Sequence, residues 1–141
     1  MLEKIIFPYD FSKYGEKAIP YIEKFKSIGG KEVIIINVVE YNEVFKHVLY
    51  NELELKRFQE KMNLRLQPLK ERFEKIGFDV TTCVEFGPPD KVIIKKAFEY
   101  KADIIVMGAQ GRGAVGSFFL GSTALNVLQR SSIPVLVVPL K

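Results

Sequence analysis

Short apolar runs alternate with longer amphipathic stretches along this sequence. The longer stretches carry apolar residues three and four positions apart with charged residues between them, which is typical of helices that bury one face. They cover residues 12–28, 52–77, 89–101 and 122–131. The apolar runs predict strands, and they are KIIFP (4–8), VIIINVV (33–39), DVTTCVEF (79–86), ADIIVMG (102–108) and PVLVVP (134–139).

Two of the apolar runs, residues 33–39 and 104–107, are apolar on both faces of the predicted strand. A strand buried on both faces belongs to a parallel sheet that helices cover on both sides. The sequence therefore predicts an α/β fold: an open, doubly wound, five-stranded parallel sheet of Rossmann-like type with helices on both faces. In such sheets, ligands bind beyond the carboxyl ends of the strands, where the strand order reverses.

Several residues mark where the predicted helices begin, bend or end. Ser12 suits the N-cap of the first helix, and Gly29-Gly30 suits its end. Pro68 lies within the second helical stretch and should kink or split it, because proline lacks a backbone donor and crowds the preceding turn. Residues 40–51 fit neither pattern, so we expect a partly helical insertion there, near the ligand end.

Composition narrows the class of protein. A length of 141 residues, 48% of them hydrophobic, is enough for one domain over residues 1–141 with a single core. The single cysteine, Cys83, cannot form an internal disulfide, and the single histidine, His47, has no second ligand at metal spacing. We therefore expect a cytoplasmic protein without a zinc site. No run approaches the roughly 18 apolar residues of a membrane span, and we expect no signal peptide.

The formal net charge of +4 comes from helices rich in lysine and glutamate rather than from a basic tail. Aromatic residues lie among the lysines in SKYGEK (12–17) and KKAFEYK (95–101), but their spacing fits amphipathic helices. Charges in this pattern usually form solvated faces. We therefore expect neither a nucleic acid nor a membrane as a partner.

The segment GAQGRGAVGSFFLGSTA (108–124) holds five glycines directly after the fourth predicted strand. G-x-G-x-x-G at 111–116 matches the dinucleotide-binding fingerprint, but that fingerprint belongs in the first strand-to-helix turn. GSFFLGST at 116–123 has the length of a phosphate loop, with serine in place of its lysine. The position of the first motif disfavours a nicotinamide or flavin dinucleotide, and the missing lysine disfavours a standard P-loop nucleotide hydrolase.

A third spacing in this segment, G-x2-G-x9-G-S at 108–122, resembles the signature of the universal stress protein family in its ATP-binding branch. Three further segments resemble the family's first strand and turn, its third helix and fourth strand, and its last strand. They are KIIFPYDFS (4–12), GPPDKVIIKKAFEYKADIIVMG (87–108) and SSIPVLVVP (131–139). The resemblance covers nearly the whole chain. It implies the fold of the adenine nucleotide α-hydrolases and, as ligand, ATP with Mg²⁺ carried on its phosphates.

The residue types in this segment suit a phosphate site independently of the resemblance. Gly111 and Gly121 would let backbone amides approach phosphate oxygens, and Gly108 would let the chain turn sharply off the sheet. Ser122 and Thr123 begin the last predicted helix, where amides and the helix dipole favour an anion. A ligand-free, glycine-capped turn is the alternative that the residues leave open.

The resemblance implies that Asp10 binds the ribose hydroxyls while Pro8 and Tyr9 shape the adenine side. An aspartate after a strand also commonly caps the next helix, although Ser12 already suits that role. Tyr9 is bulkier than the residue usual in the family and could stack on adenine or crowd it. The expected nucleotide-binding residues are Pro8, Tyr9, Asp10, Val38, Met107, Gly108, Gly111, Arg112, Gly121, Ser122 and Thr123.

The other roles that the resemblance implies lie at strand ends and in the glycine segment. The backbone of Val38 would meet adenine and Met107 would form a hydrophobic wall, although periodicity alone makes both residues plain core. Arg112 could reach phosphates or face solvent. Gln110 and Ala124 depart from the family's pattern, and Ala124 would remove one hydroxyl contact to phosphate.

The last predicted strand also suggests a partner. Residues Ile133 to Leu140 are apolar on both faces and form a sheet edge, which leaves backbone groups unpaired. Members of the resembled family dimerise through this strand. We therefore expect a homodimer with two-fold symmetry.

The resemblance implies a nucleotide-dependent regulator of a stress response that acts on a downstream protein the sequence does not identify. Two other functions stay open. Slow ATP hydrolysis or phosphate transfer would have only Arg112, Gln110 and hydroxyls to support it. A nucleotide-free dimeric scaffold would leave the glycine spacing without a ligand. An FMN protein would need its phosphate loop after the first strand, and a phosphorylated receiver would need an acidic pair near Asp10.

Overall fold

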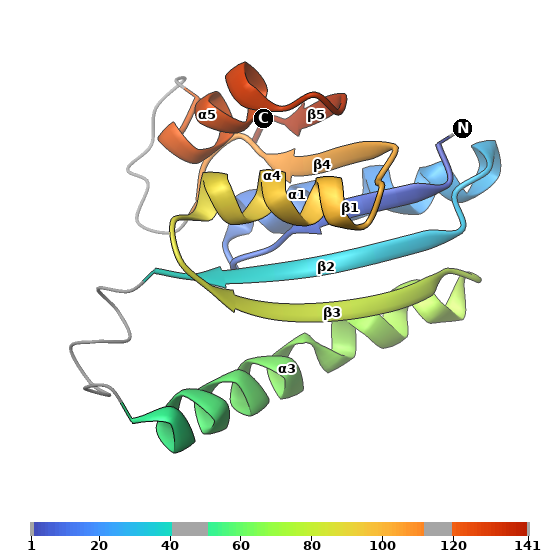
Figure 1. The fold of residues 1–141 in the computed structure, drawn as a ribbon. Helices are drawn as coiled ribbons and strands as arrows, with labels where there is room; N and C mark the ends of the chain where they lie inside the picture. Colours follow the sequence, from blue (N-terminus) through green and yellow to red (C-terminus); the bar gives the residue numbers. More distant parts are fainter. Residues whose placement is uncertain (1, 41–50, 112–119, 141) are drawn as a thin grey trace.

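A five-stranded parallel sheet lies at the centre of the fold (Figure 1). The structure, a computed structural model, describes residues 2–40, 51–111 and 120–140. Its strand order is β3-β2-β1-β4-β5, so the order reverses between β1 and β4. All the pairings are parallel. The strands are β1 (Lys4–Pro8), β2 (Glu32–Val39), β3 (Asp79–Phe86), β4 (Ile104–Gly108) and β5 (Val135–Val138).

Helices cover both faces of the sheet, as the sequence predicts. α1 and α3 pack on one face, and α4 and α5 pack on the other (Figure 1). A short 3₁₀ helix, η1 (Lys26–Ile28), follows α1. The bounds of the helices are α1 (Lys13–Phe25), α3 (Glu52–Lys75), α4 (Pro89–Glu99) and α5 (Ser122–Arg130). The predicted open, doubly wound α/β sheet is confirmed.

The two helical layers explain why β2 is apolar at nearly every position. Val33 and Ile35 belong to the core beneath α1 and α3, whereas Ile34 and Ile36 belong to the core beneath α4 and α5. All four side chains are 0% exposed. Successive strand residues point to opposite faces, so a strand covered on both sides needs apolar residues at odd and even positions alike.

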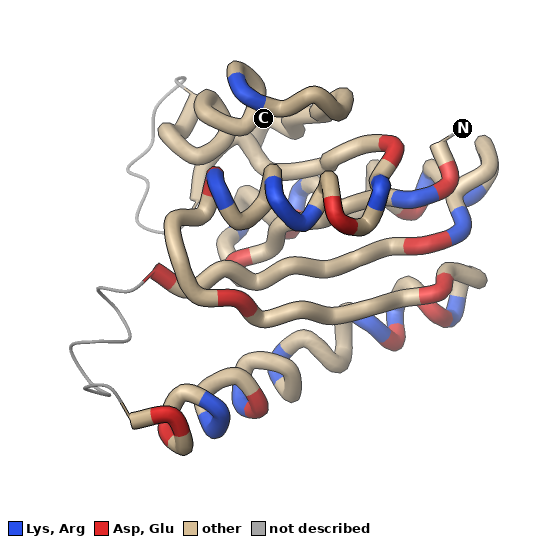
Figure 2. Tube along the Cα trace, viewed as in Figure 1, with Lys and Arg blue, Asp and Glu red and all other residues tan. Residues whose placement is uncertain are grey.

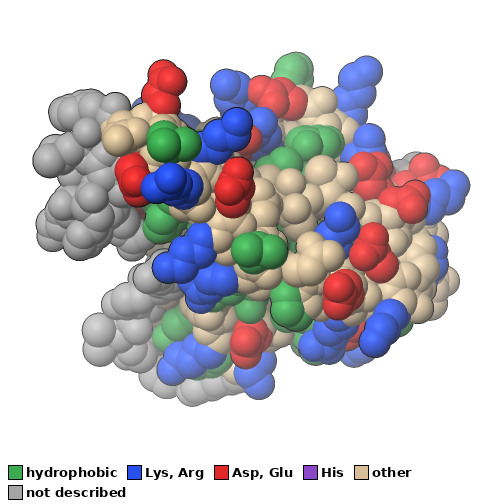
Figure 3. Space-filling view, turned by 90° about the horizontal axis from the view of Figure 1, so that it is seen from below, with side chains coloured by type: hydrophobic (Ala, Val, Ile, Leu, Met, Phe, Trp, Pro, Cys, Tyr) green, Lys and Arg blue, Asp and Glu red, His purple; other side chains and the backbone are tan. Residues whose placement is uncertain are grey.

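Charged residues lie mainly on the helices and at the strand ends, and the strands between are largely free of charge (Figure 2). On the face seen in Figure 3, basic and acidic side chains are interspersed and only scattered hydrophobic ones are visible. This pattern fits the solvated charged faces that the sequence predicts. Within the described ranges, no helix combines the length and apolar character needed to cross a membrane.

The helix boundaries follow the capping residues. Ser12 is the N-cap of α1, and its hydroxyl accepts a hydrogen bond from the Gly15 amide. Asn51 caps α3 in the same way. Pro68 does not split α3, which runs unbroken through it. The carbonyl of Leu64 that loses its donor lies on an exposed turn, where water can replace the missing amide. Residues 41–50 of the expected insertion lie outside the described residues.

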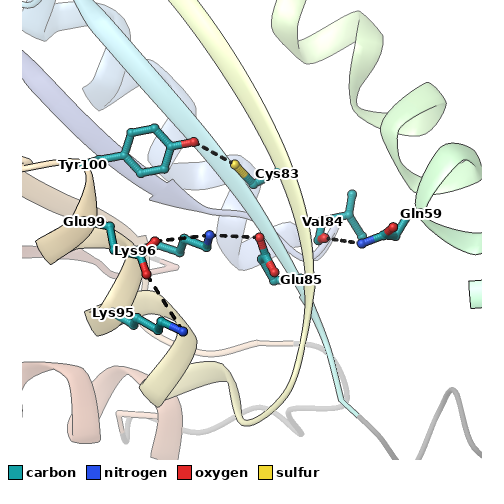
Figure 4. A network of polar contacts seen from close by, with 8 residues as sticks. All are labelled: Gln59, Cys83, Val84, Glu85, Lys95, Lys96, Glu99 and Tyr100. Carbon is teal, nitrogen blue, oxygen red and sulfur yellow. Dashed lines mark hydrogen bonds and ion pairs between the residues drawn. The ribbon is translucent and has the colours of Figure 1, made fainter. Parts of the chain in front are cut away.

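A polar network fastens α4 to the edge strand β3 (Figure 4). The Lys96 ammonium lies 3.1 Å from Glu85 of β3 and 3.4 Å from Glu99 of its own helix. The Cys83 thiol and the Tyr100 hydroxyl lie 3.3 Å apart in the same layer. The hydrogen bond to Cys83, followed by burial, raises the pKa of Tyr100 to about 12.

We predict that the Tyr100 contact weakens in strong alkali. A raised folded-state pKa means that the fold favours the protonated hydroxyl, so the stabilisation is complete below the ordinary pKa of 10.0 and is lost toward about 12. The free energy of unfolding of wild type should therefore exceed that of Tyr100→Phe near pH 9, and the difference should shrink by pH 12. Urea unfolding at stepped pH measures it. Tyr21→Phe, at an exposed tyrosine, is the control; a difference that stays constant with pH would contradict the prediction.

Candidate functional site

A cleft of about 960 Å³ opens at the strand-order reversal, beyond the carboxyl ends of β1, β2 and β4. Its volume is in the range of small-molecule sites in proteins. Arg112 of the expected site lies outside the described residues. All the other expected residues line the cleft, and they are Pro8, Tyr9, Asp10, Val38, Met107, Gly108, Gly111, Gly121, Ser122 and Thr123.

The turn between β1 and α1 presents Asp10 to the cleft. One Asp10 carboxylate oxygen, Oδ1, accepts a hydrogen bond from the Ser12 amide at 3.0 Å. Ser12 in turn caps α1, so the sequence expectation for Ser12 is confirmed. Asp10 itself organises the turn as well as lining the cleft. Phe11, between the two, has a positive φ of 66°, a left-handed conformation that destabilises a residue with a β-carbon by about 1–2 kcal/mol.

Aromatic and cationic side chains surround Phe11. The Phe11 ring centroid lies 5.1 Å from that of Tyr9. The Arg65 guanidinium, which comes from α3, lies 3.8 Å from the centroid of the same Phe11 ring. A cation over an aromatic face is worth about 0.5–1 kcal/mol at an exposed site and more when desolvated. Burial, followed by the nearby Glu16 and Asp10 carboxylates, raises the pKa of Tyr9.

Asn37 fastens the end of β2 to the first residue after β1. Its Nδ2 group donates a hydrogen bond to the Tyr9 carbonyl at 3.0 Å, while the Tyr9 amide donates to the Ile36 carbonyl at 2.9 Å. Asn37 is 4% exposed, and its Oδ1 atom has no hydrogen-bond partner among the described residues. Burying a polar side chain in an apolar strand reduces stability unless its groups are hydrogen-bonded. Here its amide fixes the β1–α1 turn against β2.

The two ends of the glycine segment are joined by one backbone hydrogen bond. The Gly121 amide donates to the Ala109 carbonyl at 2.8 Å, and the Ala109 amide donates to Val138 of β5 at 3.0 Å. We call Ala109 and Gly121 the neck of the segment. α5 begins immediately after the neck, and its first turn leaves the amides of Ser122 and Thr123 without acceptors inside the helix. These amides lie at the positive end of the helix dipole.

Gly108 does not provide the sharp turn that the sequence led us to expect. It is the last residue of β4, and its φ is not positive. A β-carbon at Gly108 would lie 2.6 Å from the Tyr14 carbonyl oxygen of α1. The glycine is needed because two backbones approach each other closely. Gly111 is less constrained, since a β-carbon there would lie 2.8 Å from a side-chain atom only, the second carboxylate oxygen, Oδ2, of Asp10.

The charged lining of the cleft comes from both acidic and basic residues. Asp10 and Glu40 are acidic, whereas α3 contributes Lys61 and Arg65. Among the described residues, neither Lys61 nor Arg65 forms an ion pair, and the only other polar contact of Arg65 is a 3.9 Å approach to the Met62 sulfur. In the described ranges, no three His, Cys, Asp or Glu side chains are grouped closely enough to hold a metal ion.

Comparison with known proteins decides the family. The family model described as the universal stress protein family matches residues 1–139. The chain belongs to the universal stress protein family. Universal stress protein MJ0577 of Methanocaldococcus jannaschii is 32% identical over 158 aligned positions, which cover 100% of this chain and 97% of the relative. A universal stress protein of Thermus aquaticus is 29% identical, with 98% of this chain and 99% of the relative covered.

Solved structures agree with this assignment. The structure of MJ0577 has a TM-score of 0.88 at 34% identity, covering 99% of this chain and 96% of that chain. More distant members share the fold: a universal stress protein in complex with cAMP has a TM-score of 0.71 at 20% identity, covering 99% of this chain and 98% of that one. A family protein of Arabidopsis thaliana with AMP bound has a TM-score of 0.66 at 17% identity, covering 97% and 91%.

Sequence reasoning missed several residues that line the cleft, namely Asn37, Lys61, Arg65, Pro89 and Ile93. Asn37 could have been noticed, because it is the one polar residue in VIIINVV. Nothing in the sequence pointed to Lys61 and Arg65 as cleft residues, since they are among many charged residues on an amphipathic helix. Pro89 and Ile93 fit the pattern of an ordinary amphipathic helix, so the sequence did not indicate that they line a cleft.

We predict that Gly108→Ala destabilises the fold by about 1–3 kcal/mol, the usual range for overpacking. The added methyl group would meet backbone of α1, which cannot move aside without shifting the helix. Urea unfolding measures the effect. Gly111→Ala is the matched control, because its methyl group would meet only a carboxylate oxygen and Gly111 itself is exposed. Equal stability of Gly108→Ala and wild type would show that the two backbones are not in contact.

Proposed function

We propose that this protein binds ATP in the cleft at the strand-order reversal and acts in the cytoplasm as a nucleotide-dependent regulator of a stress response. The observation that carries the proposal is the convergence of four separate segments on one cleft. The β1–α1 turn, the end of β2, the end of β4 and the first turn of α5 all line it. We propose further that residues 1–141 form one domain.

The adenine end of the proposed site is apolar. Pro8, Val38 and Met107 lie at the ends of β1, β2 and β4 and line the cleft side by side. Met107 is 5% exposed, so its side chain forms part of a packed wall rather than a mobile rim. Apolar walls with a few polar backbone groups are typical of sites for flat heterocycles. In the proposal, the backbone of Val38 supplies the polar contact to adenine.

The ribose would lie at Asp10. Its Oδ1 atom already accepts from Ser12, but a carboxylate has about four acceptor positions on its two oxygens. Oδ2 lies next to Gly111, where a β-carbon would be 2.8 Å away and would crowd the carboxylate. In the proposal, Asp10 accepts hydrogen bonds from the ribose hydroxyls.

The phosphates would lie at the start of α5. Gly121 places no side chain at the N-cap, and the amides and hydroxyls of Ser122 and Thr123 follow in the first turn. Each favourable charge–dipole interaction at a helix N-terminus is worth about 0.3–1 kcal/mol when exposed, so several groups must act together. In the proposal, Mg²⁺ is carried on the phosphates and contributes by neutralising their charge.

Relatives support nucleotide binding in general. Two members of the family with the same fold have been solved with cAMP and with AMP, respectively. Both ligands contain adenine, ribose and phosphate, the three parts that the cleft is proposed to receive. The choice of ATP rests on the glycine spacing and on the amide-rich start of α5.

We predict that ATP with Mg²⁺ raises the melting temperature of protein stripped of co-purified nucleotide, because a ligand at a hundredfold excess over its Kd stabilises the fold by about 2.7 kcal/mol. Asp10→Asn keeps the side-chain shape but removes the charge, and it should weaken ATP binding about tenfold or more. Calorimetric titration measures both proteins. Asp79→Asn, at an exposed aspartate at the start of β3, is the control. Absence of any shift for wild type at millimolar ATP would refute the proposal.

We further propose that the protein forms a homodimer through β5. The two edges of the sheet differ. At the β3 edge, the Gln59 amide of α3 donates to the Val84 carbonyl at 3.0 Å and so covers part of the edge. Lys96 and Glu85 add charge beside it. No comparable side-chain hydrogen bond reaches the backbone of Val135–Val138 from the described residues. An uncovered apolar edge favours pairing with a second copy.

We predict that wild type sediments at twice the 16.1 kDa monomer mass at micromolar concentration. Val135→Lys should shift it toward monomer, because lysine on an edge strand opposes pairing. Circular dichroism verifies that the variant is folded. Thr81→Lys places the same charge on the β3 edge and should leave the dimer intact. A monomeric wild type would exclude this interface.

A further inference from the structure

We propose that Arg65 of α3 is a positioning residue for the ribose site, acting through Phe11 on Asp10. The inference rests on the proposed function, because it concerns how Asp10 is held for the ribose hydroxyls. Arg65 would not touch the nucleotide. Its guanidinium stacks on the ring of Phe11, the residue that follows Asp10 in the chain.

The turn that Arg65 contacts is strained. Within the described ranges, Phe11 and Lys101 are the only residues other than glycine with a positive φ. Lys101 lies at the exposed end of α4, whereas Phe11 lies between Asp10 and the N-cap Ser12. A strained residue at the rim of a cleft stays in place only where surrounding contacts hold it.

Besides its packing against the core beneath α1 and α3, three contacts hold Phe11 in this conformation. Ser12 donates to Asp10 across it at 3.0 Å, and the Tyr9 ring packs edge-on against it at 5.1 Å. Both partners belong to the same turn, in which the backbone of Tyr9 is fixed to β2 and Phe11 follows two residues later. The Arg65 guanidinium, 3.8 Å from the ring centroid, comes from a different helix. It therefore ties the Phe11 ring to α3.

The bonding of Arg65 agrees with this role. A guanidinium on the surface commonly pairs with a carboxylate. Among the described residues, Arg65 has no carboxylate partner, whereas Arg57 and Arg72 on the same helix pair with Glu54 and Glu23. The guanidinium of Arg65 lies instead over the Phe11 ring, beside the cleft.

Release of Phe11 would change the position of Asp10. The carboxylate is held on one side by the Ser12 amide and faces Gly111 on the other, where a β-carbon would lie 2.8 Å away. A turn free to leave the left-handed region would carry the carboxylate away from this place. A ligand would then have to order the turn on binding, which lowers its affinity. The loss should appear only for ligands that use Asp10.

The test compares ATP with 2′,3′-dideoxyATP, which keeps adenine and triphosphate but lacks both ribose hydroxyls. Arg65→Met keeps the apolar stem and removes the guanidinium at an exposed position, so the fold should persist. We expect about two- to fivefold weaker binding of ATP, the scale of one exposed cation–π contact, and less than twofold change for dideoxyATP. Arg65→Lys should recover part of the loss. Lys56→Met removes the same charge from the same helix away from the cleft and should change neither ligand.

A double-mutant cycle identifies Phe11 as the intermediary. Phe11→Leu keeps apolar bulk but removes the aromatic face, so it should cause the same ATP-selective loss, and the double variant should lose no more than either single one. Equal weakening of ATP and dideoxyATP in Arg65→Met would show a direct charge contact and overturn the inference. Unchanged ATP binding, or additive losses in the double variant, would also overturn it. If wild type bound neither nucleotide, the proposed function itself would fail.

Discussion

The structure depends on the close approach of two backbones, at the end of β4 and the start of α1. Because β4 lies beside β1, α1 must cross over β4 as it leaves the first strand. A β-carbon at Gly108 would lie 2.6 Å from the Tyr14 carbonyl, so only glycine allows this distance. The same approach brings Asp10 against Gly111. One packing contact thus sets the spacing between the first turn and the glycine segment, and with it the width of the cleft.

Hydrophobic periodicity predicted the architecture because it reflects which side chains are buried. The two helical layers bury both faces of the sheet, and the strands are apolar accordingly. KIIFP corresponds to β1 and DVTTCVEF to β3 without a shift, and the start of α5 at Ser122 was also expected. Pro68 was expected to kink or split α3, and the split is wrong, since water can replace one missing hydrogen bond on an exposed turn. Gly108 was assigned to a turn because glycine spacing does not distinguish a bend from a close contact.

That Asp10, Val38 and Met107 line the cleft was expected only from the family resemblance, since periodicity alone makes Val38 and Met107 plain core. The site was not predictable where a contact joins distant elements. Arg65 reaches Phe11 across the fold, and nothing in the sequence separates it from Arg57 or Arg72. The left-handed conformation of Phe11 was equally hidden, because an aromatic residue is not expected there. Arg112 lies outside the described residues, so its role stays a prediction.

The proposed ligand site and the proposed partner surface share a set of hydrogen bonds. The Gly121 amide bonds Ala109 at the neck, and the Ala109 amide bonds Val138 of the edge strand. Phosphates bound at Ser122 and Thr123 would therefore lie next to Gly121, which is connected through Ala109 to Val138 of β5. A partner paired along β5 would hold the same backbone from the other side. Coupling between nucleotide and partner requires that each ligand bind two states of one element with different affinity, and the neck is the hydrogen-bonded link between the start of α5 and β5.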